Sequence, residues 1–193
     1  MKVLVVVDMQ NDFINGALGT PEAQAIVPNV AKYIEEHADP NTLIIFTKDT
    51  HEENYMDTLE GKKLPVPHCI RGTAGHGIVD PVFIAYSNVI TKYADAYVVY
   101  PYTDMNPIRI EKPTFGSIEL QNVLYDINEN HGIEEITLMG IDTSICVLSN
   151  AILAKATLPE TEVNVVANCC SSVSKEAHLR ALETMKLCQI NII

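Results

Sequence analysis

The first thirteen residues, Met1-Lys2-Val3-Leu4-Val5-Val6-Val7-Asp8-Met9-Gln10-Asn11-Asp12-Phe13, decide the fold of this chain. The apolar run at residues 3–7 is much shorter than the ~20 apolar residues that a membrane-spanning helix needs. Polar residues interrupt it at once, and no small-residue cleavage site follows. A run of this length rich in β-branched residues is typical of a strand covered on both faces, as in a parallel sheet. We therefore expect a buried first strand that ends at Asp8.

The rest of the chain alternates between similar runs and helical patterns. Four more strands are expected at residues 42–47, 135–139, 162–167 and 188–193. Between the runs, apolar residues recur at the i, i+3, i+4, i+7 spacing of an amphipathic helix. This spacing occurs at Val27, Val30, Ala31 and Ile34, and again at Leu120, Val123, Leu124 and Ile127. The order predicts one α/β domain over residues 1–193, a doubly wound (Rossmann-like), mostly parallel sheet with helices on both faces.

Residues 76–111 do not follow this alternation. They are rich in Tyr, Val and Pro and show no clear period, although residues 88–93 and 97–102 could each form a strand. We interpret the segment as an irregular excursion that helps subunits to pack into a homo-oligomer. A lid over the substrate is the alternative.

Composition excludes several classes of protein. With 47% hydrophobic and 20% charged residues, the chain is not disordered. Thirteen basic against 25 acidic residues give a net charge of -12, which argues against a nucleic-acid partner because such binding needs clustered Lys and Arg. Five cysteines without a signal peptide argue against a disulfide framework and favour the reducing cytoplasm, with no membrane partner.

Reactive side chains follow three of the expected strands. Asp8 ends the first strand, Asp49 and His51 follow the second, and Cys146 lies beyond residues 135–139. Ligands of open α/β sheets bind beyond the carboxyl ends of the strands, so we expect these side chains to converge. Burial would raise the pKa of Asp8 and suit it to proton transfer. Lys112 taken alone reads as a solvated lysine.

Cys146 is the cysteine with the best case for reactivity. It follows Thr143 and Ser144, which we interpret as caps, so its thiol would lie in the first turn of a helix, where the helix dipole lowers a thiol pKa. Catalytic and structural roles are evenly balanced on these features alone. For Cys169, Cys170 and Cys188, which lie after or at the start of expected strands, packing is the simpler explanation.

A possible metal site lies between residues 49 and 68. Asp49 and His51 are two residues apart and can share one side of an extended segment. His68 follows in a loop, and Glu60 between them could be a fourth ligand. Mixed carboxylate and imidazole ligands suit a divalent transition metal ion.

Several segments together resemble the signature segments of the isochorismatase-like cysteine hydrolases. They are Asp8-x-Gln10-x-Asp12-Phe13, Lys112-Pro113-x-Phe115 and Gly140-Ile141-x-Thr143-x-x-Cys146, and their order and spacing also match. The segment Asp49-x-His51, then Glu60, then Pro67-His68-Cys69-x-x-Gly72-Thr73 resembles the metal-binding loop of the nicotinamidase-like branch.

The resemblance implies specific roles for these residues. Asp8, Lys112 and Cys146 would form a catalytic triad, and the backbone amides of Asp142 and Cys146 would form an oxyanion hole beside a cis peptide between Ile141 and Asp142. Phe13 would line the substrate pocket. Asp49, His51, Glu60 and His68 would hold a divalent metal, zinc by resemblance.

The activity that the resemblance implies is hydrolysis of a small carboxamide through a thioester, with nicotinamide as substrate and NAD salvage as the role. Two alternatives stay open at this point. One is hydrolysis of another small amide, such as a ureido or carbamoyl compound. The other is a non-catalytic binding or assembly protein, which is disfavoured because all three triad positions are filled.

Overall fold

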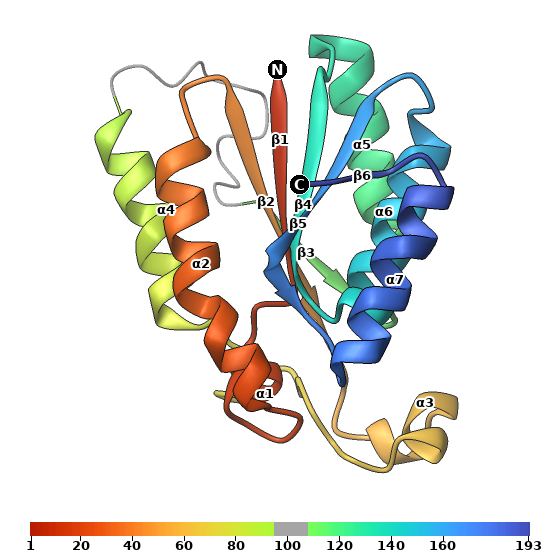
Figure 1. Ribbon diagram of the computed structural model, residues 1–193. Coiled ribbons are helices and arrows are strands. Elements are labelled where there is room, and N and C mark those ends of the chain that lie inside the picture. Colours follow the sequence, from red (N-terminus) through yellow and green to blue (C-terminus); the bar gives the residue numbers. More distant parts are fainter. Residues whose placement is uncertain (95–107) are drawn as a thin grey trace.

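The computed structural model describes residues 1–94 and 108–193 and shows one domain built on a parallel sheet (Figure 1). The six strands have the order β3-β2-β1-β4-β5-β6, so the sheet is doubly wound outward from β1, as predicted. The strands are β1 (Lys2–Val7), β2 (Thr42–Asp49), β3 (Ile108–Lys112), β4 (Glu135–Ile141), β5 (Glu162–Ser171) and β6 (Asn191–Ile192).

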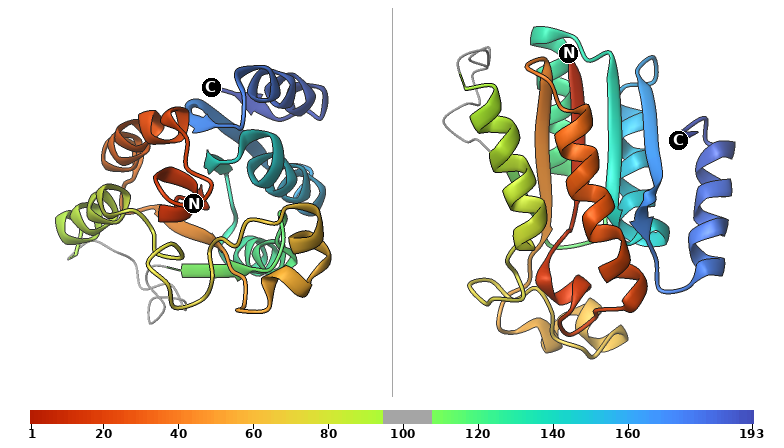
Figure 2. Two further views of the ribbon diagram at one scale, coloured as in Figure 1. Left: turned by 90° about the horizontal axis from the view of Figure 1, so that it is seen from below. Right: turned by 60° about the vertical axis from the view of Figure 1, so that its left-hand side comes forward.

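Helices cover both faces of this sheet. α2 (Pro21–His37) and α4 (Asp80–Lys92) pack together on one face, and α5 (Ile118–His131), α6 (Leu148–Thr157) and α7 (Lys175–Leu187) lie on the other (Figures 1 and 2). Two short helices, α1 (Asn11–Ile14) and α3 (Leu59–Lys63), lie beyond the carboxyl ends of the strands (Figure 2). In the part of the chain that the structure describes, no helix combines the length and apolar character needed to cross a membrane.

The predicted helix starts have a local cause in their capping residues. Ser117 and Ser174 each accept a hydrogen bond from the backbone amide three residues on, at Leu120 and Ala177. Thr20 caps α2 in the same way through the amide of Ala23. Each cap satisfies one of the unpaired amides at a helix N-terminus and so fixes where the helix begins.

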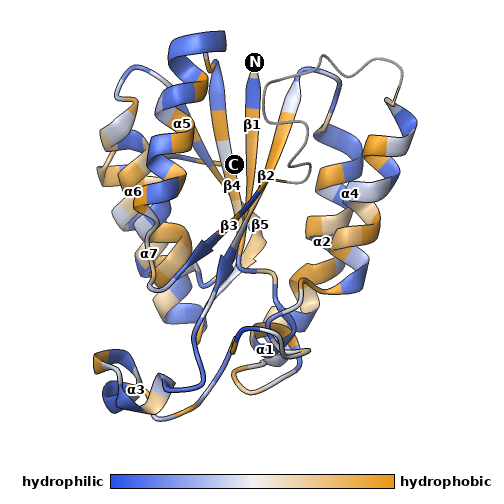
Figure 3. Ribbon diagram, turned by 180° about the vertical axis from the view of Figure 1, so that it is seen from behind, coloured by the Kyte–Doolittle hydropathy of each residue, from blue (hydrophilic) through white to orange (hydrophobic). Residues whose placement is uncertain are grey.

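The register of the strands brings the functional residues to one edge. β1 is central and almost wholly buried, which is why its sequence is a continuous apolar run, whereas the edge strand β3 is mostly hydrophilic (Figure 3). Val7 pairs with Thr47 on one side and with Gly140 on the other, and Asp49 pairs with Lys112. Gly140 has a φ of 128°, and a Cβ there would lie 2.0 Å from the carbonyl oxygen of Val7, so only glycine fits.

Residues 76–111 differ from the prediction of an irregular excursion. Their described part contains α4 and the edge strand β3, which together form an ordinary crossover unit of the sheet. A strand at 88–93 is wrong, because that stretch lies largely within α4, whose buried face is formed by Val82, Ala85, Tyr86 and Val89. The possible strand at 97–102 lies outside the described residues.

The last predicted strand is also shorter than expected. β6 covers only Asn191–Ile192, with Ile193 adding backbone hydrogen bonds to Val165 and Ala167 of β5. Cys188 is the exposed C-cap residue of α7 rather than a buried strand residue. The last helix continues to Leu187 on its own apolar spacing and leaves few residues for a strand. Cys169 and Cys170 lie inside β5, which runs on to Ser171, and both are buried as expected.

Candidate active site

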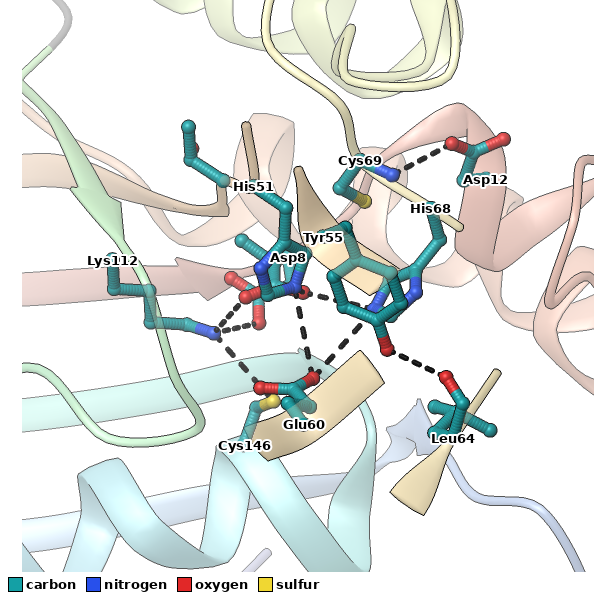
Figure 4. Close-up of polar contacts among 12 residues, drawn as sticks. Asp8, Asp12, His51, Tyr55, Glu60, Leu64, His68, Cys69, Lys112 and Cys146 are labelled. Carbon is teal, nitrogen blue, oxygen red and sulfur yellow. Dashed lines mark hydrogen bonds and ion pairs between the residues drawn. The ribbon is translucent and has the colours of Figure 1, made fainter. Parts of the chain in front are cut away.

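Asp8, Lys112 and Cys146 come together at the carboxyl ends of β1, β3 and β4 (Figure 4). The Lys112 Nζ atom lies 2.6 Å from Asp8 Oδ2 and 3.6 Å from Cys146 Sγ. The side chains of Asp8 and Lys112 are both 0% exposed, so the ion pair is shielded from water. The prediction from its local sequence alone that Lys112 is solvated is therefore wrong. The lysine ends a strand that the sequence pattern does not reveal.

The Asp8 carboxylate is held from two sides. Thr47 Oγ1 donates to Asp8 Oδ1 at 2.7 Å, and Lys112 holds the other oxygen. Asp8 has a φ of 48°, which turns the chain sharply out of β1 and is uncommon for a residue other than glycine. Burial raises the pKa of Asp8, helped by the charge of Asp49, and the opposing effect of Lys112 and Thr47 is smaller. A carboxylate of raised pKa is suited to exchange a proton at neutral pH.

Cys146 begins a helix as predicted, but its thiol pKa is not lowered. The residue lies in the turn Thr143–Val147, which continues directly into α6. Burial raises the pKa of the thiol well above its usual value, and the neighbouring Asp8 adds to this, while Lys112 opposes it. The expectation of a lowered pKa is therefore wrong for the resting site, because burial disfavours the thiolate more than the charge of Lys112 favours it. The resting thiol is protonated and needs a base.

A second cluster lies next to this group. The ligand atoms of Asp49, His51, Glu60 and His68 all lie within 4.8 Å of one another. The Nε2 atoms of His51 and His68 are 3.0 and 3.3 Å from Asp49 Oδ2, and 3.6 and 3.9 Å from Glu60 Oε1. Donors held at about 2.1 Å around one tetrahedral zinc ion are roughly 3.4 Å apart, so the observed spacing fits a divalent ion at this position.

Neighbouring groups for which the sequence predicted no role hold these ligands in place. Gln10 brackets the backbone of Asp49, accepting from its amide at 2.7 Å and donating to its carbonyl at 2.9 Å. The Nδ1 atom of His68 lies 2.8 Å from the carbonyl of Val66, which leaves Nε2 facing the cluster. Although burial raises the pKa of Asp49, hydrogen bonds from both histidines and the charge of Lys112 hold it well below its usual range.

The loop that carries His68 is fastened to the first signature segment. Asp12 Oδ2 accepts from the amide of Cys69 at 2.7 Å, and its backbone amide donates to Gly75. A Cβ at Gly75 would lie 2.0 Å from the same carboxylate, so any larger residue here would displace Asp12 from the Cys69 amide. Cys69 itself is buried, burial raises the pKa of its thiol, and it is not among the residues that line the cavity beside Cys146.

The turn before Cys146 is organised by the Asp142 carboxylate. The peptide bond between Ile141 and Asp142 is cis. Asp142 caps the turn by accepting from the amide of Ser144 at 2.6 Å, and it accepts from the Ser172 hydroxyl and the Val173 amide at 2.7 and 2.8 Å. These bonds tie the end of β5 to the turn that bears the thiol.

A cavity of about 270 Å³ joins the two clusters. Cys146 and Asp142 line it together with the ligands Asp49, Glu60 and His68. Its apolar wall consists of Phe13, Leu18, Ala23, Leu64, Phe115, Ile141, Ile145 and Val173. The volume lies just below the range of about 300–1,000 Å³ that is usual for drug-sized ligands, so the cavity suits a small molecule.

A buried thiol, carboxylate and ammonium lie together at the carboxyl edge of a doubly wound sheet, an arrangement that suits nucleophilic catalysis by a cysteine. The Isochorismatase domain model matches residues 2–193, so the chain belongs to the isochorismatase family. The nicotinamidase/pyrazinamidase of Mycobacterium tuberculosis is 26% identical over 200 residues, covering 100% of this chain and 98% of that protein.

Solved structures agree with this assignment. A pyrazinamidase of Pyrococcus horikoshii in complex with zinc is 27% identical with a TM-score of 0.74, covering 100% of this chain and 98% of the other. The N-carbamoylsarcosine amidase of Thermoplasma acidophilum, 24% identical with a TM-score of 0.71 over 100% of this chain and 95% of the other, shows the shared fold. The chain is a hydrolase acting on amides, in the nicotinamidase-like branch, and its ligand cluster indicates a divalent metal site.

The structure thus brings together every residue singled out from the sequence. Asp8, Lys112 and Cys146 form one contact group, the four expected ligands form another, and Phe13 lies in the wall of the cavity between them. The sequence predicted no role for Thr47, Gln10 or Asp12. Of these, only Gln10 and Asp12 lie in a segment that the resemblance covers.

Proposed function

We propose that the protein is a cysteine amidohydrolase that converts nicotinamide to nicotinate and ammonia through a thioester on Cys146. The observation that carries the proposal is the contact of Asp8 and Lys112 with Cys146, together with a small cavity that Cys146 lines along with the Asp49, Glu60 and His68 ligands. A pyridine carboxamide needs a nucleophile at its amide carbon and a partner for its ring nitrogen, and this cavity offers both within one small volume.

In the first half-reaction, Asp8 accepts the proton of the Cys146 thiol while the sulfur forms a bond to the amide carbon. Lys112 lies within reach of both groups and offsets the negative charge as it moves from carboxylate to sulfur and on to oxygen. The C–N bond then breaks, and Asp8 returns the proton to the nitrogen, which leaves as ammonia. In the second half-reaction, Asp8 takes a proton from the water that attacks the thioester carbon. The C–S bond then breaks, the acid leaves, and Asp8 returns the proton to the Cys146 sulfur.

The negative oxygen formed in each step is stabilised by the backbone amides of Asp142 and Cys146. Both residues border the cavity, at the turn that Asp142 itself caps. An oxyanion donor of this kind is worth about 3–4 kcal/mol of transition-state stabilisation. The bonds from Ser144, Ser172 and Val173 to the Asp142 carboxylate hold this turn in position before substrate arrives.

Asp49, His51, Glu60 and His68 are the residues that would hold the metal, and two imidazoles with carboxylates suit zinc. When bound, the ion supplies a Lewis-acidic partner for the ring nitrogen of the substrate. Phe13, whose ring centroid is 5.5 Å from that of His68, packs beside the ring that enters the cavity.

The charge of the cavity favours a neutral amide. No lysine or arginine is among the described residues that line it, whereas Asp49, Glu60 and Asp142 are. Lys112 lies close by but is engaged by Asp8 and, at 3.5 Å, by Asp49. A ureido or carbamoyl acid would bring a carboxylate, which proteins usually bind through arginine or lysine. This argues against such acids as substrates, and the filled triad argues against a non-catalytic protein.

The test is ammonia release from a panel of nicotinamide, pyrazinamide and a carbamoyl amino acid, with Cys146→Ala as the control. We expect turnover of the two ring amides, no turnover of the carbamoyl acid and none of any substrate by Cys146→Ala, which should keep its fold and its metal content. Turnover of the carbamoyl acid alone would contradict the proposed substrate. Homo-oligomer formation, a cytoplasmic location and a role in NAD salvage stay predictions.

A further inference from the structure

Tyr55 lies next to the two histidines of the ligand cluster (Figure 4). It begins a short turn, Tyr55–Asp57, between β2 and α3, and its side chain is fully buried at 0% exposure. Its ring contacts both imidazoles, with centroids 4.7 Å from His51 and 5.1 Å from His68, tilted by 59° and 75°. The ring therefore restricts the orientation of two ligands at once.

The hydroxyl of the same residue reaches the wall of the substrate cavity. Tyr55 Oη donates to the carbonyl of Leu64 at 2.8 Å. Leu64 is the C-cap residue of α3 and lines both the 270 Å³ cavity and a second cavity of about 740 Å³, which also share Glu60 and Phe115. Its place helps to define the partition between the two cavities.

The backbone of Tyr55 holds the start of α3 as well. Its carbonyl accepts from the hydroxyl of Thr58 at 2.7 Å, and Thr58 in turn caps α3 through the amide of Gly61. A Cβ at Gly61 would lie 2.1 Å from the Tyr55 carbonyl oxygen, so glycine is required for α3 to pack this closely. α3 also carries Glu60. Three of the four expected ligands, His51, His68 and Glu60, therefore depend on contacts made by Tyr55 or by Thr58 beside it.

We propose that Tyr55 is a positioning residue that couples the metal cluster to the wall of the substrate cavity. Its ring orients His51 and His68, while its hydroxyl fixes Leu64 at the end of α3, the helix that supplies Glu60. Binding of the metal then stabilises the cavity wall, and loss of the hydroxyl weakens both together. This inference rests on the metal site in the proposed function but not on the identity of the substrate.

The experiment compares Tyr55→Phe with Tyr125→Phe, a matched change at a half-exposed tyrosine on α5 far along the chain from the cluster. Zinc affinity is measured by competition with a chelator, and hydrogen exchange is followed at the amides of Gly61, Lys62 and Leu64, which are bonded within this segment. For Tyr55→Phe we expect a zinc Kd about tenfold weaker, as for other groups that support metal ligands. We also expect faster exchange at these three amides in the zinc-bound protein, and a raised KM with little change in kcat.

Tyr125→Phe should match the native protein in all three measurements. A zinc Kd for Tyr55→Phe within about twofold of native would overturn the proposal, as would native exchange in the 59–64 segment. Should Tyr55→Phe fail to fold, hydrogen exchange of the native protein with and without zinc tests the same coupling: zinc should slow exchange at the amides of Gly61, Lys62 and Leu64, and unchanged exchange would overturn the proposal. Zinc affinity and hydrogen exchange are measured without any reaction. This test therefore remains valid if the protein does not hydrolyse nicotinamide.

Discussion

Thr47 offers the sharpest test of Asp8 as the base, because its hydroxyl acts on the ionised form of that carboxylate. Thr47 Oγ1 donates to Asp8 Oδ1 at 2.7 Å inside the protein, where both residues are fully buried. Thr47→Val keeps the shape and the β-branched character of the strand residue but removes the donor. The backbone amide of Asp8 keeps its bond to the Thr47 carbonyl at 3.2 Å, so the main chain is not expected to move.

The size and sign of the effect follow from this geometry. A hydrogen bond to a charged group contributes about 1.5–3 kcal/mol, and one pKa unit corresponds to about 1.4 kcal/mol. Loss of the bond disfavours the carboxylate, so the pKa of Asp8, already raised by burial, should rise by a further one to two units or so. Since the free enzyme needs an ionised Asp8, the acid limb of kcat/KM should move to higher pH by that amount.

The assay is the pH profile of kcat/KM for ammonia release, with Thr137→Val as the matched control. Thr137 is a buried strand residue on β4 whose hydroxyl bonds only weakly to Asn164, at 3.5 Å, away from the site. We expect no displacement of the acid limb for this control. An acid limb that stays in place in Thr47→Val, or that moves to lower pH, would refute the assignment of Asp8 as the base.

Two further changes probe the other parts of the site. Lys112→Met leaves Asp8 buried without its counter-ion, so we expect a loss of about 3–5 kcal/mol in the free energy of unfolding at neutral pH. This loss of stability should be smaller at acidic pH, where Asp8 becomes protonated. Urea unfolding at neutral and acidic pH measures the two losses, and equal losses would contradict the role of the ion pair. In His68→Asn, the amount of zinc bound per protein, measured by elemental analysis, should fall by a factor of about ten or more. His37→Asn, at an exposed histidine on α2, should retain zinc fully; equal retention in both variants would argue against the ligand assignment.

The sheet and the convergence of the site could be predicted from the sequence because each depends on local pattern. A strand buried on both faces can be recognised from its own run of β-branched residues. Parallel strands bring their carboxyl ends to one edge of the sheet regardless of the loops that connect them. For this reason the sequence alone places Asp8, Asp49 and Cys146 together. Lys112 could not be placed in this way, because the strand that carries it is an amphipathic edge strand of five residues.

The residues that the sequence does not reveal depend on contacts between distant segments. Thr47 and Tyr55 have ordinary local sequences, and only the register of β1 with β2 and the packing of the 50–72 loop give them their roles. The helix α4 is a different kind of miss, since Asp80 and Pro81 at its start and the spacing of Val82, Tyr86 and Val89 are visible in the sequence. Its many β-branched and tyrosine residues favoured a strand instead. The pKa of Cys146 could not be foreseen, because it depends on the depth at which the thiol is buried.

The most direct test of the central claim is to trap the acyl-enzyme. Enzyme mixed with excess nicotinamide is quenched in acid during turnover, digested, and the peptide that contains Cys146 is examined by mass spectrometry. The account predicts a nicotinoyl group attached to Cys146 and absent from the peptides that carry Cys69, Cys169, Cys170 and Cys188. Sustained ammonia release by a Cys146→Ala protein, or a nicotinoyl group found on another residue, would contradict it.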